Sequence, residues 1–313
     1  MTIKIEGIIP AMVTPMRADE DLNLEVLSKL TDHLIAAGVH GLFATGSQGE
    51  AYALTRDERQ RVWETAVAAT RGRVPVYAGT GAITTREAVI LTKLAERVGV
   101  DAVSLITPYF IYPSQDELIR HYLTVADATS LPVLLYNNPG RTGGVSLAPE
   151  TVVHLAKHPN IVGVKDSSGD LSLTLEYIRR TDEDFAVLMG RDTLILAGLM
   201  MGARGAIAAT ANVAPELVVR IYEAWRCGDW TEARLAQAQL APLRQAFGLG
   251  TFPGVVKEAM TMLGLPVGPA RAPVAPLSPE RRQQLRQVVH NITLTQASAS
   301  KATIQTGGSV LTE

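Results

Sequence analysis

Short apolar runs alternate with amphipathic windows along the first two thirds of the chain. Each run closes with glycine, asparagine or charged residues, as buried parallel strands do where they meet a turn. The windows between the runs have helical spacing, and several begin at a capping residue such as Thr55 or Ser114. The pattern predicts eight strands, at Gly7–Val13, His40–Thr45, Val74–Ala78, Asp101–Ile106, Pro132–Tyr136, Ile161–Lys165, Phe185–Met189 and Gly205–Ala209.

The alternation of strands and helices predicts the fold class. Eight strand–helix units within about two hundred residues indicate an α/β protein, a closed (β/α)8 TIM barrel with extra C-terminal helices. An open doubly wound sheet is disfavoured, because nothing indicates that the strand order reverses around a switch point. Beyond Ala211 the pattern is helical only, at Pro215–Arg226, Thr231–Phe247, Pro253–Leu263 and Pro279–His290.

The same pattern divides the chain into three predicted parts. Residues 1–210 form the barrel with the active site, and residues 211–292 form a helical region packed on the barrel. Residues 293–313 are rich in Ser, Thr, Gln and Gly with little apolar periodicity, which predicts a flexible tail.

Composition and charge narrow the class of function. The formal net charge is −2, with Lys and Arg spread along the chain, so nucleic acid is not an expected partner. No apolar run approaches the roughly 18 residues that span a bilayer, so no membrane contact is expected. The lone Cys227 and the lack of a signal-peptide pattern favour the cytoplasm. His154 and His158 share a helix face but lack an H-E-x-x-H frame, so no metal is expected.

Lys165 stands at the end of the sixth apolar run. The carboxyl ends of barrel strands carry the chemistry of this fold. Desolvation at this position favours the neutral amine, which can attack a carbonyl carbon. The alternative is a surface lysine that pairs with Asp166, the next residue along the chain.

Two further side chains follow the fifth strand, which neighbours the sixth in a barrel of this order. Tyr136 ends that strand, and a buried phenol can pass protons to and from a reacting group. Its alternative role is an aromatic cap on the core. Arg141, five residues later, carries a planar guanidinium suited to a carboxylate, or else faces solvent from its loop.

A glycine-rich loop, Gly46-Ser47-Gln48-Gly49-Glu50, follows the second strand. Its amides can bind a carboxylate where the second helix begins. Nucleotide binding is weakly supported, because the chain has neither G-x-x-x-x-G-K-[ST] nor G-x-G-x-x-G at this loop or at residues 78–81.

Four motifs at strand ends give the chain a family resemblance. The G-S-Q-G-E loop at 46–50, T-P-Y at 107–109, Y-N-N-P-G-R-T-G at 136–143 and V-K-D at 164–166 resemble the dihydrodipicolinate synthase / N-acetylneuraminate lyase family in order and spacing. The resemblance covers roughly residues 5–290. It implies a class I, metal-independent lyase without a cofactor, which forms a covalent imine and assembles as a homotetramer, a dimer of dimers.

The resemblance also implies roles for individual residues. Lys165 resembles the lysine that captures pyruvate or another 2-oxo acid as a Schiff base, and Tyr136 resembles the catalytic proton shuttle. The implied substrate-binding residues are Ser47 and Gln48 for the 2-oxo acid carboxylate, Arg141 for the carboxylate of a second substrate, and Gly190 and Ile207 for the wall of the pocket.

Two positions depart from the synthase branch of that family. Phe110 stands where the branch has a tyrosine that crosses a subunit interface and completes a proton relay, and a phenyl ring cannot transfer a proton. Tyr112 is a nearby candidate to replace it. Gln48 stands where the branch has threonine, and its longer amide is better suited to holding a polar substrate group than to relaying a proton.

These departures favour reversible aldol cleavage or condensation of a 4-hydroxy-2-oxo acid, with pyruvate as product or substrate. The first alternative is 4-hydroxy-tetrahydrodipicolinate (dihydrodipicolinate) synthase, which condenses pyruvate with aspartate semialdehyde, and Arg141 keeps it open. A dehydratase or deaminase of the same family is another alternative. A non-catalytic sensor of 2-oxo acids is disfavoured, because a desolvated lysine beside a phenol is costly to keep without a use.

Overall fold

The strands form one closed parallel barrel. The computed structural model describes residues 3–306, with side chains described through residue 294. The strands are hydrogen-bonded in the order β1-β8-β7-β6-β5-β4-β3-β2, and a parallel bridge between Ala11 and Phe43 closes the ring. Their bounds are β1 (Gly7–Pro10), β2 (Leu42–Ala44), β3 (Val76–Gly79), β4 (Ala102–Ile106), β5 (Val133–Asn137), β6 (Ile161–Asp166), β7 (Ala186–Met189) and β8 (Gly205–Ala208). The expected (β/α)8 class is confirmed.

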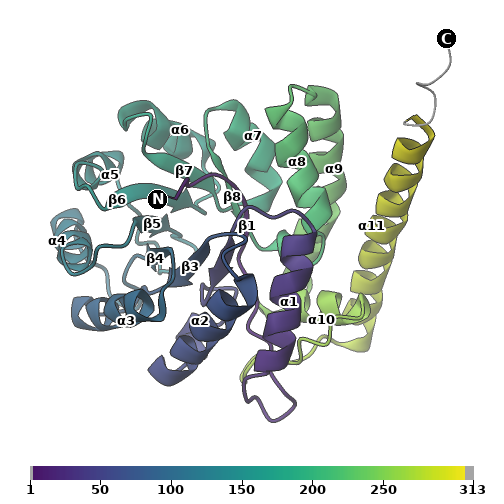
Figure 1. Cartoon of the computed structure of the whole chain (residues 1–313), viewed down its shortest axis with the longest axis horizontal. Coiled ribbons are helices and arrows are strands. Elements are labelled where there is room, and N and C mark those ends of the chain that lie inside the picture. Colours follow the sequence, from purple (N-terminus) through teal and green to yellow (C-terminus); the bar gives the residue numbers. More distant parts are fainter. Residues whose placement is uncertain (1–2, 307–313) are drawn as a thin grey trace.

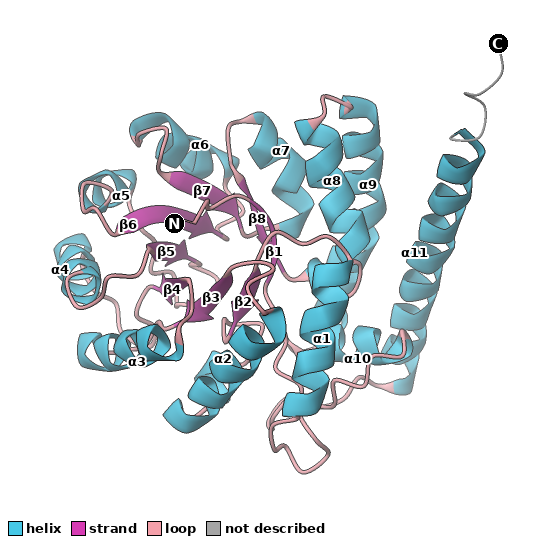
Figure 2. Cartoon of the chain, in the orientation of Figure 1, coloured by secondary structure: helices cyan, strands magenta, loops and turns pink. Residues whose placement is uncertain are grey.

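Helices surround the barrel, and a further helical layer lies on one side of it (Figure 1). Figure 2 shows the strands at the centre and helices α1 to α8 around them. The helices are α1 (Leu24–Ala36), α2 (Arg56–Thr70), α3 (Thr85–Val98), α4 (Gln115–Ala126), α5 (Pro149–Leu155), α6 (Leu171–Arg180), α7 (Ile195–Met200), α8 (Pro215–Arg226), α9 (Trp230–Ala246), α10 (Gly254–Met262) and α11 (Pro279–Thr306). Among residues 3–306, no helix is long and apolar enough to cross a bilayer.

Capping side chains start the helices where the sequence places them. Thr55 begins α2 and Ser114 begins α4, and each forms a full capping box with the glutamate three residues later, Glu58 or Glu117. The cap satisfies amide groups that have no partner inside the helix. The loops that precede α2 and α4 are therefore held at their helical ends.

Side chains alternate between two apolar layers. The barrel interior is filled by residues such as Ile9, Tyr77, Leu134 and Leu188, while the opposite faces of the strands pack against the helices. Successive residues of a strand point to opposite faces. A polar residue on an inward position near the carboxyl end of a strand therefore lies at the floor of any cavity above the barrel.

Two features differ from the division expected from the sequence. Helix α8 lies against β1 and α7 and packs into the main core through Leu217, Val218 and Ile221, so it completes the ring of barrel helices. The extra layer therefore begins at α9 and not at residue 211. Helix α11 runs to Thr306, beyond the expected end at His290 and into the segment predicted to be a tail. Residues 307–313 lie outside the described part of the chain.

Candidate functional site

Lys165 lies inside the barrel at the carboxyl end of β6. It pairs in register with Tyr136 of β5, and only 4% of its surface is exposed. Its Nζ lies 4.2 Å from the centroid of the Tyr136 ring and 5.3 Å from that of Phe43. The amine has no ion-pair partner among the described residues. These surroundings suit an amine that reacts with a carbonyl compound.

Asp166 points away from Lys165, toward the helical layer. Its carboxylate accepts hydrogen bonds from Asn137 Nδ2 at 2.9 Å, from the Ser168 amide at 3.0 Å and from Thr174 Oγ1 at 2.6 Å. The alternation of a strand forces the two neighbours onto opposite faces. The surface salt bridge between Lys165 and Asp166 is therefore absent, and Asp166 instead ties β6 to β5 and α6.

Tyr136 contributes its hydroxyl to the same space. Asn138 Nδ2 donates to the phenol oxygen at 2.8 Å. Burial opposes ionisation of the phenol, but the positive charge of Lys165 and hydrogen bonding from Asn138, Ser167 and Ser47 outweigh it, so the pKa of Tyr136 lies below its ordinary value. A phenol with a lowered pKa beside an amine is suited to moving a proton.

The glycine-rich loop brings Ser47 and Gln48 over the barrel. Gln48 is 2% exposed, and both atoms of its amide lack a hydrogen-bond partner among the described residues. We expected the loop to lead directly into α2. Instead, a 3-10 turn at Ala51–Ala53 lies between the loop and that helix. The position of the loop is maintained by Glu50, which is 0% exposed and pairs with Lys257 of α10 at 2.5 Å.

The predicted site residues surround a single cavity of about 300 Å³. The wall leaves no room for a side chain at Gly190, because an added Cβ would lie 2.0 Å from Ser167 Oγ. The cavity brings together the seven residues expected to form the imine or bind substrate: Ser47, Gln48, Tyr136, Arg141, Lys165, Gly190 and Ile207. Across the described residues, no group of three or more His, Cys, Asp or Glu side chains is placed to hold a metal ion.

Phe110 and Tyr112 stand apart from this cavity. They lie in the loop between β4 and α4, where Phe110 is 88% exposed and Tyr112 is 78% exposed. Neither lines the cavity around Lys165. Tyr112 packs near Gly143, since a Cβ added there would lie 3.2 Å from the phenol ring. Within one chain, Tyr112 therefore does not supply the hydroxyl that Phe110 lacks.

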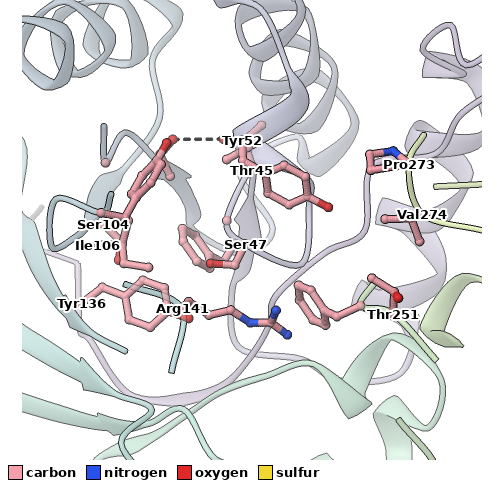
Figure 3. Close-up of a pocket in the computed structure, with 17 residues that line it drawn as sticks. Thr45, Ser47, Tyr52, Ser104, Ile106, Tyr136, Arg141, Thr251, Pro273 and Val274 are labelled. Atoms are coloured by element: carbon pink, nitrogen blue, oxygen red, sulfur yellow. Dashed lines mark hydrogen bonds between the residues drawn. The ribbon is translucent and has the colours of Figure 1, made fainter. Parts of the chain in front are cut away.

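A second cavity, of about 380 Å³, adjoins the first and is mainly apolar. Figure 3 shows Tyr136 and Ile106 on one side of it and Pro273, Val274 and Thr251 from the C-terminal region on the other. The two cavities share Ser47, Tyr136, Arg141 and Phe252. The guanidinium of Arg141 lies 4.3 Å from the centroid of the Phe252 ring, so this pair stands between the two spaces.

The cavity around Lys165 also contains residues that sequence reasoning missed. Asn138 lies within a quoted motif and could have been chosen as a polar neighbour of Tyr136. Arg191 lies two residues after the end of β7, and its place near a strand end was a usable signal. Arg244 and Phe252 come from the C-terminal region, α9 and the loop before α10, and no strand-end rule reaches them.

The fold and the site together define a class: an enzyme with an eight-stranded barrel and a buried lysine beside a phenol at the strand ends, as in lyases that bind 2-oxo acids as imines. Comparison with known proteins agrees. The model of the dihydrodipicolinate synthetase family matches residues 4–292. A 4-hydroxy-tetrahydrodipicolinate synthase of Methanoculleus marisnigri is 43% identical over 289 residues, covering 91% of this chain and 99% of the relative.

Solved structures show the same similarity. The chloride-inhibited dihydrodipicolinate synthase of Acinetobacter baumannii, complexed with pyruvate, has a TM-score of 0.90 and 37% identity, covering 93% of this chain and 99% of that one. A prophage protein of the dihydrodipicolinic acid synthase family from E. coli, also in complex with pyruvate, has a TM-score of 0.89, 36% identity and the same coverage. The chain belongs to the dihydrodipicolinate synthetase family.

Proposed function

We propose that this chain captures pyruvate as an imine on Lys165 and condenses it with aspartate semialdehyde, the reaction of a 4-hydroxy-tetrahydrodipicolinate synthase. The observation that carries the proposal is the buried amine of Lys165 in one cavity with Tyr136 and the unpartnered amide of Gln48. A buried amide without partners is costly, and a bound carboxylate or carbonyl would accept a hydrogen bond from its Nε2 group. The names of the relatives and the two pyruvate complexes support the same substrate.

The proposed chemistry follows from the positions of these groups. The Lys165 amine attacks the keto carbon of pyruvate, and loss of water leaves a protonated imine. This imine withdraws electrons, so C3 loses a proton and forms an enamine. C3 then bonds to the aldehyde carbon of the second substrate, whose oxygen takes a proton by way of Tyr136. The amino group of that substrate attacks the imine carbon, which closes the ring and releases the Lys165 amine. The imine is the electron sink, so this route uses no cofactor and no metal ion.

Each remaining residue has a part in the proposed reaction. Ser47 and Gln48 hold the carboxylate of pyruvate, and Arg141 holds the carboxylate of aspartate semialdehyde with its planar fork of N–H donors. Gly190 and Ile207 shape the wall. Fixed groups of this kind position the reactants without reorganising during the reaction.

Aldol cleavage of a 4-hydroxy-2-oxo acid, the first expectation from the sequence, is less well supported. The similar curated proteins are named as synthases, which favours the condensation that the sequence left as an alternative. The observation that keeps cleavage as a second candidate is Phe110, which has no hydroxyl for the relay.

We propose that the exposed loop around Phe110 packs on a second copy in a homotetramer.

A direct assay separates these two reactions. Purified protein is incubated with pyruvate and aspartate semialdehyde, and consumption of the semialdehyde is followed by chromatography. We expect consumption that depends on pyruvate. A parallel assay measures pyruvate release from 4-hydroxy-2-oxo acids, N-acetylneuraminate and 2-keto-3-deoxy sugar acids. Release from one of these acids without consumption of semialdehyde would replace condensation by aldol cleavage.

Phe110→Tyr tests whether the relay hydroxyl matters in this chain. If condensation proceeds without it, the condensation rate should stay within roughly twofold of wild type, because the added hydroxyl then has no proton to transfer. Tyr112→Phe is the matched control, because it removes a hydroxyl from the same exposed loop. A large gain in rate for Phe110→Tyr would show that the native chain does not use the synthase relay.

A further inference from the structure

The loop that carries Ser47 and Gln48 begins after a residue with a strained backbone. Thr45 has a φ of +53°, and within residues 3–306 it is the one β-branched residue with positive φ. A left-handed backbone is unfavourable for a β-branched side chain, and residues that keep such strain gather at functional sites. Glu50, at the other end of the loop, has a φ of +58°. The loop is therefore enclosed by two strained positions.

The side chain of Thr45 is fixed between helix α2 and strand β3. The indole Nε1 of Trp63, on α2, donates to Thr45 Oγ1 at 2.6 Å, and that hydroxyl donates to the Gly79 carbonyl at 3.3 Å. Thr45 is 1% exposed and Trp63 is 0% exposed. A turn of the Thr45 backbone to negative φ would move the hydroxyl out of this bridge and leave the buried indole N–H without its partner.

Glycines leave room for the backbone of Thr45 in this conformation. A Cβ added at Gly79 would lie 2.1 Å from the Thr45 carbonyl oxygen, and a Cβ added at Gly49 would lie 3.0 Å from the Thr45 amide nitrogen. The loop therefore folds back closely against its own start. Thr14 Oγ1 donates to the Gly49 carbonyl at 2.7 Å, which holds the end of the loop.

The loop has a second unfavourable feature, the amide of Gln48. Both of its polar atoms lack a hydrogen-bond partner among the described residues, although the side chain is 2% exposed. A loop that could relax would let this amide reach water. The hydrogen bond from Trp63 to Thr45 opposes relaxation at the start of the loop, and the ion pair of Glu50 with Lys257 opposes it at the end.

We propose that Trp63 is a positioning residue for pyruvate. Its indole N–H holds Thr45 in the strained conformation from which the loop presents Ser47 and Gln48 to the substrate carboxylate. Trp63 lines neither cavity, whereas Thr45 and Ser47 line the apolar one (Figure 3), so Trp63 acts through Thr45 and not by contact with substrate. The proposal rests on the proposed binding of pyruvate at this loop.

The expected effect is on affinity and not on the chemical step. If the loop is free to relax, only a fraction of the molecules is ready to bind, and the apparent affinity for pyruvate falls by that fraction. At saturating pyruvate every molecule has the bound conformation, so the rate is preserved. General damage to the barrel would not separate KM from kcat in this way.

Trp63→Phe removes the indole N–H and keeps a buried ring. We expect KM for pyruvate to rise by roughly 5- to 150-fold, the range that corresponds to the strain of one such residue, with kcat within about twofold of wild type. Thr45→Val removes the accepting hydroxyl and should give a similar rise. The two changes together should not add, because both break the same hydrogen bond.

Tyr177→Phe is the matched control. Tyr177 is fully buried in α6, and its hydroxyl donates to the Leu147 carbonyl, in a different loop, at 2.6 Å. This variant also loses one buried hydrogen bond from a barrel helix to a loop, but KM for pyruvate should stay at the wild-type value. An equal rise in KM for Tyr177→Phe would overturn the specific role of Trp63.

Thr45→Gly in the Trp63→Phe background separates positioning from damage to the fold. Glycine adopts positive φ without strain, so the second change should bring KM for pyruvate most of the way back to wild type, although it adds no contact. A KM that stays raised overturns the proposal. An unchanged KM in both Trp63→Phe and Thr45→Val overturns it as well, and so does a fall in kcat without a rise in KM.

Borohydride trapping of pyruvate on Lys165, measured against pyruvate concentration, checks the effect without a second substrate. In both single variants half-maximal trapping should need more pyruvate, and trapping should still be complete at saturation. Absence of trapping in wild type overturns the proposed function itself, whereas normal wild-type trapping with unshifted variants overturns only the role of Trp63. The unfolding midpoint is recorded for each variant, and Thr45→Val carries the test if Trp63→Phe does not fold.

Discussion

Lys165→Met should abolish condensation and the covalent capture of pyruvate. The variant keeps a side chain of similar length and removes the amine that forms the imine. A general acid–base group contributes roughly 10²- to 10⁴-fold to the rate, and we expect the loss in kcat here to exceed that range. The measurement is kcat together with the mass of the protein after reduction by borohydride in the presence of pyruvate.

The stability of the same variant separates loss of chemistry from loss of the fold. Lys165 is buried and has no ion-pair partner among the described residues, so its removal should leave the unfolding midpoint unchanged or higher. Lys157→Ala, at an exposed lysine before β6, is the control and should retain trapping. A pyruvate label on Lys257, the other buried lysine among the residues whose side chains are described, would contradict the assignment.

Tyr136→Phe should lower kcat by about 10²- to 10⁴-fold, because it removes the proposed proton shuttle and keeps the ring. The pKa of Tyr136 lies below the ordinary value near 10, chiefly because Lys165 and nearby hydrogen bonds outweigh burial. As pH rises, the phenol therefore ionises earlier than a free tyrosine. The pH profile of kcat/KM for wild type should bend below about 10, and the variant should lack that bend.

A matched tyrosine controls for the lost hydroxyl. Tyr77 is fully buried in the barrel interior, its hydroxyl has no partner among the described residues, and it lines neither cavity. Tyr77→Phe should leave kcat and the pH profile unchanged. If Tyr136→Phe kept the basic bend, the titrating group would be a different residue.

Much of the fold could be predicted because local patterns and tertiary packing agree. Helix α8 at Pro215–Arg226 has the expected bounds, since a proline marks its first position. The role of α8 was not readable in this way. Amphipathic helices look alike in sequence whether they close a barrel or cover it, and the contact of α8 with β1 distinguishes them here.

The candidate site shows the same division. Tyr136 and Lys165 were predictable as neighbours, because parallel strands in sequence order place their carboxyl ends at one edge. The separation of Lys165 from Asp166 also follows from the two-residue period of a strand. The ion pair between Glu50 and Lys257 was not predictable, because only the packing of α10 brings these two residues together.

The sequence by itself determined the barrel, the lysine at its strand end and the family, because each depends on periodicity or on short motifs. Only the tertiary structure decided which charges meet above that lysine. Arg244 is unremarkable as a residue near the end of a long helix, yet the packing of α9 against the segment after β7 turns it toward the cavity of Lys165. Contacts between distant segments depend on the shapes of the surfaces that pack together, and no local pattern encodes them.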